Sequence, residues 1–221
     1  MINKELIRFF DELKENNNRE WFQENKPRYD LLKKDFDQFV SKMIASVSTI
    51  DKDISYLEPK DCVFRIYRDT RFSKDKMPYK NNTGAFMVKG GKSSGNAGYY
   101  LHIEPGASFL AGGVYMPFPD VLKKIRTSVY DNIDEFLDIV NNSKFLKHFG
   151  KIDDEAKLKT PPKGFPKDFE HVEYLKFKNY TVSKALSPQM LHSNKLMDEI
   201  TEVFGVLMPL NRFLNSAIAG D

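Results

Sequence analysis

The apolar residues of the first 50 positions recur at steps of three and four, which predicts helices. A first stripe contains Leu6, Phe9, Phe10 and Leu13. Three asparagines end it, and Asn17 with Glu20 has the spacing of a capping box for a short turn that holds Trp21 and Phe22. Pro27 suits the first turn of a longer helix, because its missing N–H would be unpaired there. The apolar positions of that longer helix are Tyr29, Leu32, Phe36, Phe39, Val40, Met43, Ile44 and Val47.

After residue 51 the apolar positions alternate, which is typical of strands. The alternation predicts strands at residues 63–67, 84–89, 99–104 and 108–115. Pro105-Gly106 suits the central positions of a type II turn between the last two. Gly112-Gly113 inside a strand indicates a bulge or a close backbone approach. Residues 62–115 are therefore expected to form an antiparallel meander.

Helical spacing returns in residues 117–149, where Asp131-Asn132 separates two amphipathic segments. Three prolines and a glycine in residues 157–168 forbid regular structure there. Residues 180–186 read as one more strand, and Ser187-Pro188 begins a terminal helix that Pro209 ends or kinks, so residues 178–218 form a C-terminal strand and helix. The pattern predicts an α+β fold in a single domain, residues 1–221. An antiparallel or mixed sheet of about five strands packs against N- and C-terminal helices.

Composition agrees with one globular domain. The chain has 221 residues, and a protein of this size buries roughly 70 % of the surface of its unfolded chain. The single cysteine, Cys62, excludes an intrachain disulfide and any cysteine-based zinc site, which fits a reducing cytosol. No apolar run approaches the roughly 20 residues that span a bilayer, and no signal peptide is visible. The expected location is the cytoplasm, with no membrane partner.

The charge is concentrated in one stretch. The whole chain carries a formal charge of only +3, yet residues 65–80 contain six basic residues and two acids. The basic residues are Arg65, Arg68, Arg71, Lys74, Lys76 and Lys80, and the acids are Asp69 and Asp75. A strand that runs into a cationic loop is a common layout for a binding site. The guanidinium fork of arginine also matches phosphate or carboxylate in two parallel bonds.

The predicted ligand is therefore an anionic small molecule that carries phosphate or carboxylate. The expected ligand-binding residues are Arg65, Arg68, Asp69, Arg71, Lys76, Tyr79, Lys80 and Trp21. In this hypothesis Tyr79 and Trp21 stack on an apolar part of the ligand. If the protein is an enzyme, Asp69 is the candidate acid–base or metal-liganding group, although the neighbouring arginines would keep its pKa low. The residues name no reaction, cofactor or oligomeric state.

Two other interpretations of the basic stretch stay open. In one, Asp69, Asp75 and acids elsewhere pair with the arginines in a buried structural network. In the other, the aromatic and basic residues form a surface for single-stranded nucleic acid, where rings stack on bases and cations follow the phosphates. The small net charge disfavours the nucleic-acid interpretation.

Familiar catalytic motifs are absent from the sequence. Gly91-Lys92-Ser93 imitates the end of a phosphate-binding loop, but Phe86 stands where the first glycine is required. His102 and Glu104 share one face of a predicted strand, yet the Pro-Cys-x-x-Cys of a zinc deaminase is missing. No two histidines have the spacing of a helical zinc pair, so no metal site is assigned.

Three motifs together resemble a known family. RIYRDTRF at residues 65–72 and KMPYK at residues 76–80 are similar to the signature of a bacterial and fungal family, domain of unknown function 2461. NNREWF at residues 17–22 resembles its opening motif, and PKGF at residues 162–165 with His171 resembles its C-terminal one. Val172 follows His171, where the family usually has a proline. The resemblance implies a bacterial protein with a single-domain α+β fold, and it supplies no activity.

Overall fold

The computed structural model describes residues 1–220, which fall into two compact units. The first unit contains Met1–Met87, Tyr100–Leu110 and Ala185–Glu202. The second contains Val88–Tyr99, Ala111–Lys184 and Val203–Asp221, of which the terminal residue lies outside the described range. The single-domain organisation of residues 1–221 stays a prediction.

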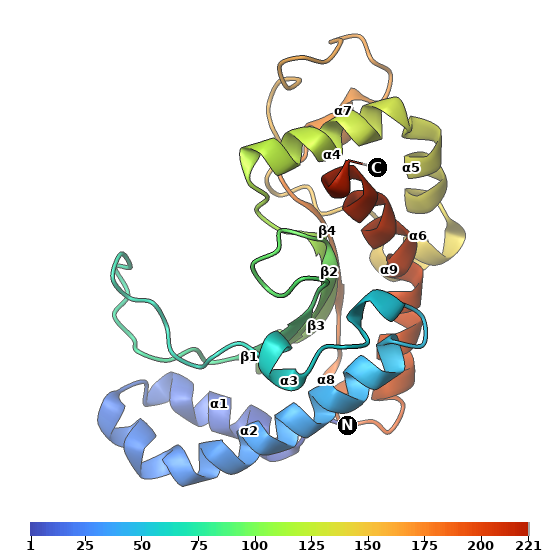
Figure 1. The fold of residues 1–221 in the computed structure, drawn as a ribbon. Coiled ribbons are helices and arrows are strands. Elements are labelled where there is room, and N and C mark those ends of the chain that lie inside the picture. Colours follow the sequence, from blue (N-terminus) through green and yellow to red (C-terminus); the bar gives the residue numbers. More distant parts are fainter. Residues whose placement is uncertain (221) are drawn as a thin grey trace. The chain divides into compact units, whose positions relative to one another are not determined.

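Helices dominate the first unit. They are α1 (Lys4–Glu15), α2 (Arg19–Val47), the 3-10 turn η1 (Lys52–Ile54), α3 (Pro59–Cys62) and α8 (Pro188–Leu191). Figure 1 shows α1 and α2 side by side. The stripe predicted for α1 is buried as expected, and so is the stripe of α2 except for Tyr29, which is half-buried.

The start of α2 differs from the prediction in two ways. The helix begins at Arg19 rather than at Pro27, so Pro27 lies inside it. The cap is Asn18, whose side chain accepts a hydrogen bond from the backbone N–H of Trp21. Asn17 is not the cap because its side-chain amide bonds to Tyr79 instead. Trp21 and Phe22 therefore belong to the first turn of one long helix.

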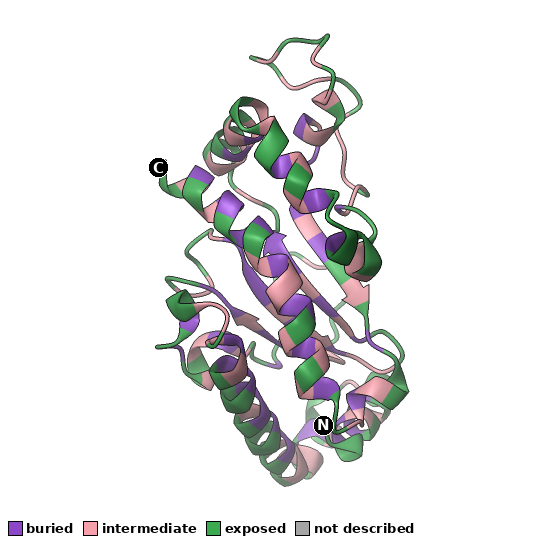
Figure 2. Ribbon diagram, turned by 90° about the vertical axis from the view of Figure 1, so that its right-hand side faces the viewer, coloured by how far each residue is buried: buried purple, intermediate pink, exposed green. Residues whose placement is uncertain are grey.

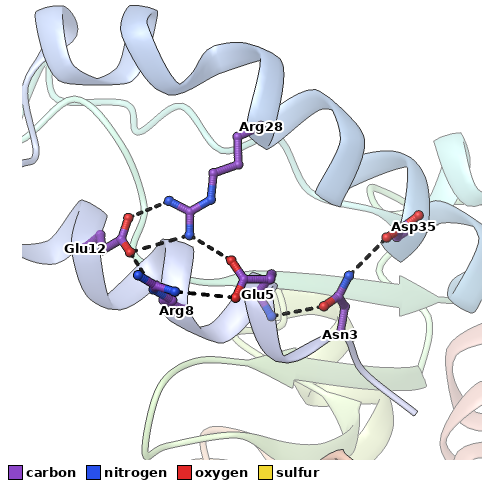
Figure 3. A network of polar contacts seen from close by, with 6 residues as sticks. All are labelled: Asn3, Glu5, Arg8, Glu12, Arg28 and Asp35. Atoms are coloured by element: carbon purple, nitrogen blue, oxygen red, sulfur yellow. Dashed lines mark hydrogen bonds and ion pairs between the residues drawn. The ribbon is translucent and has the colours of Figure 1, made fainter.

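A charged network joins α1 to α2 (Figure 3). The guanidinium of Arg28 in α2 reaches both Glu12 and Glu5 of α1, and its nitrogen lies 3.2 Å from the Glu5 carboxylate. Arg8 adds a second bond to Glu12, at 2.9 Å. The hydrogen bond from Arg28 holds the pKa of Glu12 below its ordinary value. Because these side chains lie at the surface, the network orients the two helices more than it stabilises them.

The sheet has four strands within residues 1–220, in the order β1-β2-β3-β4 and antiparallel. They are β1 (Thr83–Met87), β2 (Gly98–Ile103), β3 (Phe109–Val114) and β4 (Tyr180–Ala185). Figure 2 shows buried residues, in purple, along these strands. Four of the five predicted strands are thus confirmed with small shifts of their ends.

The fifth predicted strand, residues 63–67, is wrong. The segment makes only two isolated bridges, Val63 with Ala85 and Tyr67 with Tyr79. Backbone hydrogen bonds pair Ile66 with Lys80 and Phe64 with Gly84. The paired positions are therefore two residues apart in this segment but four residues apart in its partner. The extra residues between Lys80 and Gly84 interrupt the ladder in the manner of a bulge.

Two local predictions for the sheet are confirmed. The N–H of Ala107 donates to the carbonyl of Glu104 at 3.2 Å, and Gly106 has φ +73°, as a type II turn requires. Gly113, with φ +100°, lies so close to β4 that an added Cβ would stand 2.0 Å from the carbonyl oxygen of Tyr180.

The second unit holds the remaining helices. They are α4 (Pro119–Asp131), α5 (Ile133–Val140), α6 (Ser143–Phe149), α7 (Val172–Leu175) and the part of α9 (Leu196–Ala219) after Glu202. Pro209 does not end the terminal helix, because α9 continues through it to Ala219. Leu210, Phe213 and Leu214 are buried, and their burial favours continuation. Within residues 1–220, no helix is long and apolar enough to cross a membrane.

We predict that Gly113→Ala destabilises the protein much more than Gly91→Ala. Both glycines have positive φ, where any other residue costs about 1–2 kcal/mol. A Cβ at Gly91 meets nothing within 4 Å, whereas one at Gly113 meets the Tyr180 backbone, so Gly113→Ala should cost about 3 kcal/mol or more. Urea unfolding of both variants measures the difference. Equal losses would show that β3 and β4 do not approach as closely as described.

Candidate functional site

The base of the basic loop, which we define as residues 65–80, is tied to the corner between α1 and α2. The side-chain amide of Asn17 donates to the carbonyl of Tyr79 at 3.0 Å and accepts from the N–H of Tyr79 at 3.1 Å. This two-bond arrangement reproduces the pairing of a neighbouring strand. It brings together two of the motifs that the sequence placed about 60 residues apart, NNREWF and KMPYK.

Aromatic rings reinforce the same connection. The ring of Tyr79 is only 3 % exposed and stacks on Phe22, with centroids 4.0 Å apart. Tyr67, the bridge partner of Tyr79, packs at 5.5 Å. Such a stacked pair contributes about 0.5–1.5 kcal/mol beyond the area it buries. The predicted ligand contact through Tyr79 is therefore replaced by a core contact with Phe22.

Trp21, which was expected to stack on a ligand at the basic loop, packs against α1 instead. Its ring is half-buried and contacts Phe9 of α1, with centroids 5.6 Å apart. The interaction is with the helical hairpin and not with the basic loop. Trp21 thus supports the corner that holds the loop.

Two arginines of the basic loop form ion pairs with acids of the same loop. Arg71 forms a bidentate contact with the Asp69 carboxylate. Nε donates to Oδ1 at 2.9 Å, and Nη2 donates to Oδ2 at 2.6 Å. Arg68 bonds to Asp75 at 2.6 Å and to the carbonyl of Met77 at 3.3 Å. The side-chain hydrogen bond from Arg71 lowers the pKa of Asp69 to about 2. Asp69 is therefore ionised at neutral pH and cannot serve as a general acid.

These pairs belong to the surface and form no buried network. The Arg71 side chain is 77 % exposed, and its guanidinium lies over the ring of Phe72, itself 95 % exposed. Lys76 donates to the carbonyl of Thr70 at 3.0 Å across the loop. Asp69, Arg71 and Lys76 therefore shape the outer part of the loop.

Arg65 and Lys80, which we call the cation pair, have a different environment. The Lys80 ammonium lies 5.5 Å from the ring of Phe64. Burial lowers the pKa of Lys80, and the nearby charge of Arg65 lowers it further. Within residues 1–220, neither side chain has a carboxylate within the 4.0 Å of an ion pair. The two like charges therefore lie together without an ion-pair partner among these residues, although the charge of Arg65 helps to lower the pKa of the Asp69 carboxyl.

A hydrogen-bonded chain of polar side chains lies on β2 and its end, and sequence reasoning did not assign it. The hydroxyl of Tyr100 lies 2.9 Å from Nδ1 of His102, and Nε2 of His102 lies 2.9 Å from Glu104. Asn81 donates to the other oxygen of Glu104 at 3.2 Å. The alternation of Tyr100, His102 and Glu104 with apolar residues was the signal that could have found this chain.

This polar chain approaches the cation pair through one ring. Phe64, which the Lys80 ammonium contacts, packs edge-to-face against Tyr100, with centroids 6.1 Å apart. Burial and the charge of Glu104 raise the pKa of Tyr100 to about 12, so its phenol is protonated at neutral pH. Among the described residues, no three side chains of His, Cys, Asp and Glu are grouped to hold a metal ion.

The C-terminal motif lies in the second unit. Phe165 and Phe169 both pack against Tyr130 of α4, with centroids 5.7 and 4.9 Å away, and His171 contacts Phe169 at 5.9 Å. Val172 is the first residue of α7. A proline also suits the first position of a helix, so Val172 is compatible with the turn of the relatives.

Comparison with family models finds one match over nearly the whole chain. The family described as "Conserved hypothetical protein (DUF2461)" matches residues 5–213. That range includes all three motifs quoted from the sequence. Comparison with curated proteins and with solved structures found no match.

We predict that Asn17→Ala costs about 1–3 kcal/mol, because it leaves a donor and an acceptor of the Tyr79 backbone without partners. Asn18→Ala is the matched control, since it removes one helix cap worth about 1 kcal/mol. Urea unfolding gives the stabilities, and hydrogen exchange follows the Tyr79 amide. Exchange at Tyr79 should accelerate in Asn17→Ala alone. Unchanged exchange there would contradict the assigned anchor.

Proposed function

The chain belongs to the DUF2461 family, and we propose that its basic loop binds an anionic small molecule that carries phosphate or carboxylate. The family description names no ligand or reaction, so the proposal rests on the residues of this chain. One observation carries it: burial and the nearby charge of Arg65 lower the pKa of Lys80, and no described carboxylate lies within 4.0 Å of either cation.

The electrostatic argument starts from the cost of this arrangement. A half-buried ammonium loses part of its hydration, and a second cation nearby adds repulsion. Both effects favour loss of the proton from Lys80, as its lowered pKa records. A bound phosphate or carboxylate would offset both effects at once. Phe64, beside Lys80, offers a ring face to an apolar part of the ligand.

The other predicted residues take supporting roles in this proposal. Arg68 and Arg71 hold their own carboxylates at the surface, where ion pairs contribute little and can be exchanged for a ligand anion. Asp69 orients Arg71, and Lys76 fixes the shape of the outer loop. Tyr79 anchors the loop from the core side, and Trp21 supports the helical corner to which the loop is tied. We place the protein in the cytoplasm of a bacterial cell, a location that fits a chain whose single cysteine, Cys62, is buried.

A surface for single-stranded nucleic acid is the second candidate, and one observation favours it. Phe72 is 95 % exposed at the outer part of the loop, beside Arg71, where a base could stack on its ring. This candidate predicts a steep loss of affinity with salt, with a slope of about −0.7 per phosphate neutralised. Removal of Phe72 would weaken strand binding and leave the binding of inorganic phosphate unchanged.

We predict that inorganic phosphate raises the melting temperature of the protein at constant ionic strength. At ten times its Kd, phosphate adds about 1.4 kcal/mol, or roughly 3–6 °C for a chain of this size. Lys80→Met should abolish the rise because it removes the half-buried cation. Lys123→Met, an exposed lysine of α4, is the control with the same change of charge. Differential scanning calorimetry with phosphate replaced by chloride measures the effect.

Two results would decide against this proposal. A rise that persists in Lys80→Met would place the anion elsewhere. No rise in the wild type, combined with salt-dependent strand binding that Phe72→Ala weakens, would favour the nucleic-acid surface.

A further inference from the structure

The polar chain on β2 has a defined direction of hydrogen bonding. A carboxylate only accepts, and Glu104 receives one bond from Asn81 and another from Nε2 of His102. Nε2 therefore carries the imidazole hydrogen of neutral His102. This leaves Nδ1 as an acceptor, and the Tyr100 hydroxyl, 2.9 Å away, donates to it.

Neighbouring groups fix each member of the chain. The ring of Phe109 stacks on His102, with centroids 4.6 Å apart at 20°, and packs on Tyr100 at 5.9 Å. The buried hydroxyl of Ser108 bonds to both the N–H and the carbonyl of Glu104. The three side chains are thus held in one geometry before any ligand arrives.

Gly84 makes room for the outer end of the chain. A Cβ at this position of β1 would stand 2.6 Å from the Tyr100 hydroxyl and 2.8 Å from its ring. The Tyr100 side chain therefore crosses over the neighbouring strand, where only glycine allows it. Both Tyr100 and His102 are partly exposed, and the His102 side chain is 12 % exposed.

We propose that Tyr100, His102 and Glu104 form a proton relay that acts on a hydroxyl group or water molecule beside the anion bound at the cation pair. Tyr100 is the group that touches the substrate, His102 is the base, and Glu104 is a positioning residue. This inference rests on the proposed function for the location of the substrate. It adds a reaction type, general-base activation of an O–H group.

The proton transfer balances without any other reactant. The substrate O–H bond breaks and its proton goes to the Tyr100 oxygen, while the original phenolic proton moves to Nδ1 of His102. The product is an imidazolium between Tyr100 and the Glu104 carboxylate, with the substrate oxygen left anionic. Lys80, which Phe64 separates from Tyr100, supplies a positive charge on the far side of that ring. From β3, the neutral ring of Phe109 is the group that faces the imidazole.

The relay can be tested without knowing the natural substrate, because sulfonyl fluorides react with a tyrosine whose proton is removed. The Tyr100 oxygen forms a bond to sulfur, the S–F bond breaks, fluoride leaves and His102 takes the phenolic proton. The neutral probe is phenylmethanesulfonyl fluoride, and the site of labelling is read by peptide mass spectrometry. Tyr115, 72 % exposed, serves as the internal reference within the same molecule.

We expect the neutral probe to label Tyr100 at least tenfold faster than Tyr115, although Tyr115 is more exposed. General-base assistance is worth about 10²–10⁴ in rate. His102→Gln should therefore reduce the Tyr100 rate to that of Tyr115 or below, and Glu104→Gln should reduce it by about tenfold. In the wild type, the rate should rise with pH through a single ionisation, and Glu104→Gln should move that ionisation to lower pH. A structural role alone would not shift the profile.

Two results would overturn the relay. The first is a wild-type protein in which Tyr100 reacts no faster than Tyr115, a comparison that needs no variant to fold. The second is a Tyr100 rate that is unchanged in a folded His102→Gln variant.

An anionic probe separates this inference from the proposed function. 4-(Fluorosulfonyl)benzoate carries a carboxylate, so the cation pair should speed its reaction with Tyr100 relative to the neutral probe, and Lys80→Met should remove that advantage. Fast labelling by the neutral probe without an anionic advantage would contradict the anion site and support the relay. An anionic advantage at Tyr115 and Tyr100 alike, with no dependence on His102, would contradict the relay.

Discussion

The basic loop depends on one contact, the pairing of the Asn17 side chain with the backbone of Tyr79. Two hydrogen bonds fix the chain direction at Tyr79, and the stacked ring of Phe22 fixes its side chain. Lys80 follows directly, and its N–H bonds to the carbonyl of Ile66, which places it beside Phe64 and near Arg65. The position of the cation pair is therefore set by core packing at the helical corner, not by attraction to an acid.

The basic side chains of the loop are of two kinds, those that pair with a nearby acid and those that have no ion-pair partner among the described residues. At the outer part, Arg68 and Arg71 are neutralised by acids a few residues away in the sequence, and these pairs are open to water. At the base, Lys80 is half-buried and Arg65 is exposed, neither has an ion-pair partner among the described residues, and the Lys80 ammonium lies against the exposed ring of Phe64. A half-buried cation that lacks a partner is costly for folding, and such costs are common where a protein binds a ligand. The ring of Phe64 separates Lys80 from Tyr100, the first member of the polar chain with His102 and Glu104.

Much of the fold could be predicted because the signals were local. Apolar spacing located α1, most of α2 and four strands, and turn chemistry located Gly106 and the close approach at Gly113. The errors came from contacts between distant segments. The sequence predicted Asn17 as a helix cap, but its side-chain amide bonds to the backbone of Tyr79 instead. Residues 63–67 alternate like a strand, but extra residues in the partner segment interrupt the pairing. For the site, charge spacing selected the basic loop as a candidate, but only the fold shows that Tyr79 is buried, that Trp21 packs on Phe9 and that Lys80 is less exposed than Arg71.

The most direct test of the cation pair is the pKa of Lys80 itself, measured by the ¹⁵Nζ chemical shift of labelled lysine with and without inorganic phosphate. In the free protein this pKa should lie below those of exposed lysines such as Lys123, because burial and Arg65 disfavour the charged form. Saturating phosphate should raise it, since a bound anion favours the ammonium. A Lys80 pKa that phosphate leaves unchanged, while other lysines respond, would contradict an anion site at Arg65 and Lys80.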